Sequence, residues 1–133
     1  MSVTYIPQAL RRTVWGRAEE RCEYCGIREN DTGFGCEVDH IISEKHMGRT
    51  ESENLALACF FCNRNKGSDI GSVRSADDAE IIRFFNPRID IWSEHFALDA
   101  NQRIVPLTEI GRVTARVLGF KAENRVIERQ ESR

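Results

Sequence analysis

The spacing of apolar residues predicts a helix at the start of the chain. Four of them recur at every fourth position: Ile6, Leu10, Val14 and Ala18. Side chains four residues apart lie on one face of a helix, so this spacing predicts a helix over residues 7–20 that packs on a core. Pro7 suits the first turn, where a missing backbone N–H costs nothing.

The middle of the chain alternates between short apolar runs and polar stretches. "CEVDHII" from Cys36 predicts a short strand, and the polar "SEKHMGRTESEN" that follows predicts a loop. "LALAC" predicts a second strand, and "FFCNRNKG" predicts the start of a helix. The expected order is therefore strand, loop, strand, helix.

Turn residues and caps divide the C-terminal part of the chain. A short helix is predicted around Ala76–Phe85, with Ser75 as its N-cap and Pro87 ending it. The aromatic "IDIWSEHF" is expected to pack on the core, and His95 within it is expected to be a packing histidine. A hairpin is predicted around Asp99–Asn101.

A last amphipathic helix is expected after Thr108, a good N-cap, with Gly119 as its stop. It is followed by a polar tail in which Arg125, Arg129 and Arg133 are spaced by four. If the tail is helical these arginines share a face, and we expect that face to be solvated.

Two CxxC pairs carry the strongest chemical signal in the sequence: Cys22 with Cys25, and Cys59 with Cys62. Each pair in a tight turn presents two thiolates to one point, and two pairs complete a tetrahedral zinc site. A closed four-thiolate site has no position for substrate, so this zinc is expected to be structural. Redox or disulfide chemistry is the alternative. The fifth cysteine, Cys36, is expected to be a buried, inert thiol.

Composition places the protein among water-soluble globular chains. It has 133 residues, 41% hydrophobic and 30% charged, which is typical of one domain. No apolar run is long enough to span a membrane and the first residues lack the order of a signal peptide, so a cytoplasmic location is expected. The net charge of −2 is the sum of an acidic middle and two basic ends. This distribution is compatible with cation ligands and phosphate contacts, but charge alone favours a mixed, solvated surface.

The residues around His40 fit hydrolysis of a phosphodiester. Asp39 and Asn63 offer oxygen ligands to a hard cation such as Mg²⁺, and a neutral His40 could take a proton from water. Arg64, Lys66 and Arg49 could contact phosphates. One obstacle is geometric. Adjacent residues of a regular strand point to opposite faces, so we expect a bulge or strand end at the Asp39–His40 pair.

Four pieces of sequence, in this order and spacing, resemble the HNH endonuclease family: "CEYCG", "EVDHII", "ENLALAC" and "CNRNKG". The resemblance is strongest over residues 22–67. It implies a ββα-metal fold, with His40 as the general base, Asp39 and Asn63 as ligands of a catalytic Mg²⁺ or Mn²⁺ ion, and Asn54 bracing the loop that orients the histidine. Asn63 stands where the family has His or Asn, and its amide oxygen tilts the metal choice toward Mg²⁺ or Mn²⁺.

The expected fold is thus α+β: a zinc-braced ββα-metal core with flanking helices and a C-terminal hairpin and helix. We expect one domain over residues 1–133, divided into an N-terminal helix (1–21), the core (22–67) and a C-terminal extension (68–133). The expected function is a metal-dependent DNA endonuclease. A non-catalytic zinc module that binds nucleic acid or protein is the alternative, and the sequence leaves an RNA substrate and the oligomeric state open.

Overall fold

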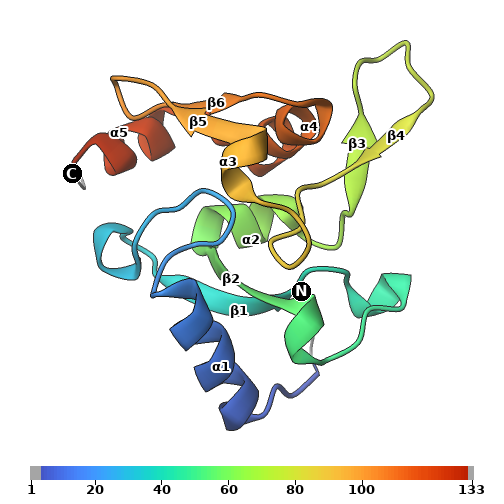
Figure 1. Cartoon of the computed structure of the whole chain (residues 1–133), viewed down its shortest axis with the longest axis vertical. Coiled ribbons are helices and arrows are strands. Elements are labelled where there is room, and N and C mark those ends of the chain that lie inside the picture. Colours follow the sequence, from blue (N-terminus) through green and yellow to red (C-terminus); the bar gives the residue numbers. More distant parts are fainter. Residues whose placement is uncertain (1–3, 132–133) are drawn as a thin grey trace.

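The computed structural model describes residues 4–131 of the chain. It contains short helices and three separate antiparallel strand pairs (Figure 1). The helices are α1 (Gln8–Ala18), α2 (Phe60–Lys66), α3 (Trp92–His95), α4 (Glu109–Leu118) and α5 (Glu123–Glu131). The paired strands are β1 (Cys36–His40) with β2 (Leu55–Cys59), β3 (Gly71–Val73) with β4 (Ile81–Arg83), and β5 (Phe96–Leu98) with β6 (Ile104–Pro106). No helix in this range is long and apolar enough to cross a bilayer.

The β1–β2 pair lies between two helices, with α1 on one side and α2 on the other (Figure 1). The alternation in "LALAC" explains this arrangement. Leu55 and Leu57 join Val14 of α1 in one apolar cluster, while Ala56 and Ala58 join a second cluster that contains the cysteines. Large residues thus fill the space under α1. Small residues let α2 and the two knuckles, the tight turns that carry the CxxC pairs, approach closely.

The second cluster is the larger of the two, and it connects the core segment to the C-terminal extension. Tyr24 lies in it with Phe84, Phe85, Phe96 and Phe120. Trp92 packs against it and donates its ring N–H to the Tyr24 carbonyl at 2.7 Å. Because the same cluster buries residues from both segments, the extension covers one side of the ββα unit.

Most predicted elements are confirmed. The N-terminal helix, the strand–loop–strand–helix order and the β5–β6 hairpin lie where expected. Thr108 caps α4 by accepting a hydrogen bond from the Gly111 N–H, and Gly119 ends α4 at a φ of 72°. His95 is a packing histidine, as predicted, with its ring beside Phe85 and its Nδ1 2.6 Å from the Thr108 hydroxyl.

The helix predicted around Ala76–Phe85 is wrong. This segment forms the turn and second strand of the β3–β4 hairpin. Asp78 accepts a hydrogen bond from the Glu80 N–H and contacts Arg74, while the Ser75 carbonyl accepts from the Asp78 N–H. These local bonds replace the helical ones, so Ser75 opens a turn and caps no helix.

The glycines at 16 and 111 give a matched test of this packing. A methyl group on Gly16 would meet nothing within 4 Å, whereas on Gly111 it would lie 2.4 Å from the His95 carbonyl oxygen. Gly16→Ala is expected to raise the free energy of unfolding by up to about 1 kcal/mol, because alanine favours helix. Gly111→Ala is expected to lower it by about 1–3 kcal/mol, because α4 must move off its neighbour. Urea unfolding measures both; equal effects would contradict the packing described.

Candidate metal centre and catalytic cleft

The four cysteines of the two CxxC pairs meet in one buried cluster. Their sulfur atoms all lie within 4.8 Å of one another, and none of them forms a disulfide. The first pair lies in a tight turn in which Gly26 adopts a φ of 81° and the Cys25 N–H points to the Cys22 sulfur at 3.4 Å. The second pair spans the junction of β2 and α2. Zn²⁺ in structural sites is held by four tetrahedrally arranged ligands, and four converging thiols can supply them. The cluster therefore supports the predicted structural zinc site.

Arg125 from the C-terminal helix α5 covers this cluster. One guanidinium nitrogen lies 3.1 Å from the Cys62 sulfur and 3.7 Å from the Cys59 sulfur, and the other donates to the Leu118 carbonyl at 2.6 Å. The side chain is only 3% exposed. Sequence analysis placed the arginines of the tail on a solvated face, and this is wrong for Arg125 and Arg129, which are both buried; Arg133 lies outside the described residues.

The burial of Arg125 against the cysteines has an electrostatic explanation. Four thiolates around one Zn²⁺ carry a net charge of −2, and burying that charge is costly without a nearby cation. Arg125 supplies one positive charge and N–H donors to the sulfurs, as ligand-contacting residues around metal sites commonly do. No local sequence pattern predicted this contact, because it joins residues 63 positions apart.

His40 and Asp39 lie in a regular ladder. Asp39 pairs with Ala56 and His40 with Leu55, without a bulge. His40 is the last residue of β1, so of the two predicted alternatives the strand end is confirmed and the bulge is not. Both residues nonetheless line one cleft of about 310 Å³, together with Glu37, Asn63 and Arg11. Within residues 4–131, β1 pairs with no strand other than β2, so its outer edge is left without a strand partner between α1 and α2 (Figure 1). A cleft along that edge collects side chains from both faces of the strand.

The His40 ring is buried, at 2% exposed, and one of its two nitrogens forms a hydrogen bond. Its Nε2 lies 2.8 Å from the Thr50 hydroxyl. Its Nδ1 is also buried and finds no hydrogen-bond partner among the residues that the structure describes. Thr50 comes from the loop after β1, and sequence analysis did not single it out. Nothing in its local sequence marks it, since ten residues separate it from His40.

Asn63 has a similar orphan atom. Its amide nitrogen donates to the Glu37 carboxylate at 3.2 Å, whereas its buried Oδ1 has no partner within residues 4–131. Buried polar atoms without partners are costly and uncommon, and an oxygen in this state beside carboxylates is suited to bind a cation or a water molecule. Glu37 was also missed by sequence analysis, although its position two residues before Asp39 places it on the same face of the strand.

Asn54 braces the loop between β1 and β2. Its Oδ1 accepts from the Ile42 N–H at 2.9 Å, and its Nδ2 donates to the carbonyls of Ile42 and Arg49, each at 2.9 Å. Gly48 lies against this clamp, where a methyl group would come within 1.7 Å of the Ile42 carbonyl oxygen. The clamp fixes the loop that carries Thr50, so Asn54 acts on His40 only through the backbone and Thr50.

The basic residues predicted to contact phosphates separate into two groups. Arg49 and Arg64 are exposed. Lys66 is 3% exposed and donates to the His40 carbonyl at 3.0 Å, with the Asp39 carboxylate 3.8 Å away. Burial lowers the pKa of Lys66, and the nearby Asp39 charge opposes that shift. Lys66 therefore holds the end of β1, and its contact with a phosphate stays a prediction. Arg88 of the C-terminal extension contacts Glu23, which lies between the cysteines of the first CxxC pair.

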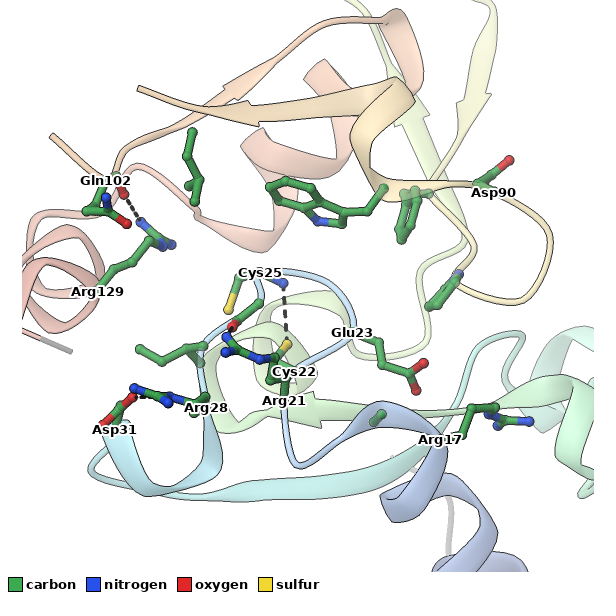
Figure 2. A pocket seen from close by; sticks show the side chains of 17 residues that line it. Arg17, Arg21, Cys22, Glu23, Cys25, Arg28, Asp31, Asp90, Gln102 and Arg129 are labelled. Carbon is green, nitrogen blue, oxygen red and sulfur yellow. Dashed lines mark hydrogen bonds and ion pairs between the residues drawn. The ribbon is translucent and has the colours of Figure 1, made fainter. Parts of the chain in front are cut away.

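A larger cavity of about 610 Å³ lies on another side of the molecule, between the first knuckle and the C-terminal extension. In Figure 2, Arg21 and Cys25 lie on one side of it, and Asp90 and Gln102 of the C-terminal extension lie on the other. Its carboxylates are engaged with arginines: Asp31 with Arg28 in the lining, and Asp90 with Arg83 and Glu23 with Arg88 outside it. None of His40, Asp39 and Asn63 lines it. The residues with the chemistry for hydrolysis are therefore those of the smaller cleft.

Replacing one cysteine tests the zinc site. Cys59→Ser removes a thiolate from the cluster, so we expect the purified variant to lose its equivalent of zinc and most of its cooperative unfolding transition, because site formation and folding are linked. Elemental analysis and circular dichroism measure the two quantities. Cys36→Ser, outside the cluster, is the control. A folded, zinc-free Cys59→Ser protein would rule out the structural zinc.

Arg125→Met tests the contact between α5 and the cysteines. The variant keeps much of the apolar bulk but removes the charge and the N–H donors, so zinc is expected to transfer to a chromogenic chelator about ten times faster. Arg112→Met, an exposed arginine on α4, should leave the rate unchanged. Equal rates for all three proteins would show that Arg125 does not stabilise the metal-bound thiolates.

Comparison with known families is consistent with this arrangement. A scan against family models matched residues 22–69 to the model described as HNH endonuclease. A search of curated proteins found no match to the chain. The matched segment begins at the first knuckle, contains the cleft residues of β1 and ends just after α2. Residues 22–69, which contain the four-cysteine cluster, are thus similar in sequence to the HNH endonuclease family.

Proposed function

We propose that this protein is a metal-dependent endonuclease that hydrolyses phosphodiester bonds of DNA in the cleft along β1. One observation carries the proposal: two buried polar atoms without partners among the described residues, His40 Nδ1 and Asn63 Oδ1, line the same cleft as the Asp39 and Glu37 carboxylates. A base, an oxygen ligand and two negative charges in one opening are the parts that phosphodiester hydrolysis needs.

His40 is the proposed general base. When its Nε2 carries the proton and donates to Thr50, its Nδ1 presents a lone pair that can take a proton from the attacking water. Thr50 is then a positioning residue, because it fixes both the tautomer and the orientation of the ring. Asn54 supports the same geometry by holding the loop on which Thr50 lies.

Asp39, Asn63 and Glu37 are the residues that would hold the catalytic cation. Two carboxylates and an amide oxygen match the preference of Mg²⁺ and Mn²⁺ for oxygen ligands. When bound, such an ion supplies positive charge to the phosphoryl and leaving oxygens. Lys66 lies beside Asp39 and adds a fixed positive charge at the inner end of this group. The four-thiolate zinc site is closed and is proposed to take no part in the chemistry.

Phosphate contacts are proposed for three arginines around the cleft. Arg11 lines it, and its Nε donates to the Ile6 carbonyl at 3.1 Å, which holds the guanidinium at the cleft. Arg64 and Arg49 are exposed on α2 and on the loop before β2. Contacts of this kind are independent of sequence, so the structure points to no particular target site. We also propose that residues 1–133 form one domain and that the enzyme acts in the cytoplasm.

Paired histidine variants test the catalytic role. His40→Ala removes the base and is expected to lower the rate of plasmid cleavage in Mg²⁺ or Mn²⁺ at least 100-fold, in line with the usual contribution of general-base catalysis. His46→Ala changes an exposed histidine of the neighbouring loop and should cleave at the wild-type rate. Circular dichroism shows whether each variant is folded.

Two results would overturn this proposal. If His40→Ala cleaved as fast as the wild-type protein, His40 could not be the base. If the folded wild-type protein bound DNA but left plasmid, linear and single-stranded substrates intact across both metals, the protein would be a non-catalytic binding module. Parallel assays on RNA show whether the protein cleaves RNA as well as DNA.

A further inference from the structure

Three phenylalanines form an aromatic patch beside the start of α2: the exposed Phe34 and the half-buried Phe60 and Phe61. Phe34 is 66% exposed, and its ring stacks on Phe60 with centroids 4.9 Å apart and planes 29° apart. Phe61 meets both rings edge-on. The Arg64 guanidinium lies over the Phe60 ring, 5.8 Å from its centroid. Exposed aromatic rings of this size normally pack inside a protein, so this patch needs an explanation.

The patch borders the proposed catalytic cleft. Phe60 lies three residues before Asn63 on α2, so the two side chains share a side of the helix. Phe34 lies two residues before Cys36, the first residue of the cleft on β1. The Phe60 N–H donates to the Gly35 carbonyl at 3.1 Å, which fixes the loop of Phe34 against α2. A strand whose phosphate occupied the cleft would carry its neighbouring bases past these rings.

The loop that carries Phe34 is held on both sides. The Glu29 carboxylate accepts from the Cys36 N–H, and the Glu128 carboxylate of α5 accepts from the Gly33 N–H at 3.2 Å. Phe34 is therefore presented at the surface by a braced loop. A ring fixed in this way loses little conformational freedom when a ligand stacks on it, which favours binding.

We propose that the outer face of Phe34 is a stacking site for an unpaired nucleobase of a strand that enters the cleft. This inference rests on the proposed function and adds a substrate class: DNA that offers an unstacked base beside the scissile phosphate, as single-stranded or locally opened DNA does. Stacking on an aromatic ring tolerates any base, because every base has a π-face. Arg64, beside the stack, is placed to contact the adjoining phosphate.

The surroundings favour a nucleobase over an apolar protein surface. Of the three rings only Phe34 is exposed, so the apolar area is small, and the exposed Arg64 lies over the neighbouring Phe60 ring. Apolar docking sites for proteins are normally broad and contiguous. One free ring face with a neighbouring cation matches the size and charge of a single nucleotide unit.

Binding of two DNA probes tests the site. One is a 20-nucleotide single strand with 2-aminopurine at its centre, and the other is the same strand in a perfect duplex. Affinity is measured by anisotropy, and stacking by 2-aminopurine quenching, on the zinc-loaded full chain without added Mg²⁺ or Mn²⁺. Phe34→Leu is expected to weaken single-strand binding about tenfold, because one base–aromatic stack is lost, and to abolish the quenching. Duplex affinity should change less than twofold.

Two variants serve as controls. Phe34→Tyr keeps the ring and should restore both single-strand affinity and quenching. Ile81→Ala changes a residue that is 65% exposed on the β3–β4 hairpin and should behave as wild type. Because Phe34 is exposed, none of these changes is expected to unfold the protein, and circular dichroism verifies this.

The outcomes separate this inference from the proposed function. Wild-type affinity and quenching in Phe34→Leu would overturn the stacking site, while His40-dependent cleavage would leave the nuclease proposal standing. Conversely, Phe34-dependent binding without any cleavage would uphold the site and refute the nuclease. If Phe34→Leu instead abolished self-association seen in sedimentation and left DNA binding unchanged, the patch would be a protein contact and the stacking site would be overturned.

Discussion

The convergence of four cysteine sulfurs is the constraint on which the rest of this structure depends. It ties a turn that follows α1 to the junction of β2 and α2, 34 residues away between Cys25 and Cys59. A chain of this size has a limited core, and a metal cross-link is an effective way to hold so long a loop closed. With its ends fixed, the intervening segment has few ways to pair, and the apolar alternation of β2 selects one register.

The same junction places structural and catalytic chemistry side by side. Cys62 faces the thiol cluster, and Asn63, the next residue, faces the cleft. Successive residues of a helix are about 100° apart, so one short helix can serve two sites that do not share a ligand. Lys66, one turn later, ties α2 to the end of β1 through the His40 carbonyl. The position of the proposed catalytic groups is thus inherited from the metal-braced helix.

The C-terminal extension has a structural role in this arrangement. Arg125 carries positive charge to the cysteines, and aromatic residues from the extension fill the larger core cluster. A buried guanidinium and buried thiolates are stable only when their opposite charges compensate each other. The extension and the knuckles therefore stabilise one another, although they are distant in sequence.

The sequence by itself determined the elements of the ββα unit, the four cysteines and three residues of the cleft, Asp39, His40 and Asn63. Each depends on local spacing: two CxxC turns, a period-two strand and a run of capping and turn residues. For the segment of the β3–β4 hairpin, the sequence predicted a helix, because Ser75 and Asp78 serve equally well in a helix cap and in a turn.

Only the tertiary structure decided which contacts formed between distant segments. Thr50 on His40, Glu37 on Asn63, Arg125 on Cys62 and the burial of Lys66 follow from packing across 10 to 63 residues of chain. The tertiary structure also showed how Asp39 and His40 share a cleft: an open strand edge collects side chains from both faces, which no reading of strand periodicity could reveal.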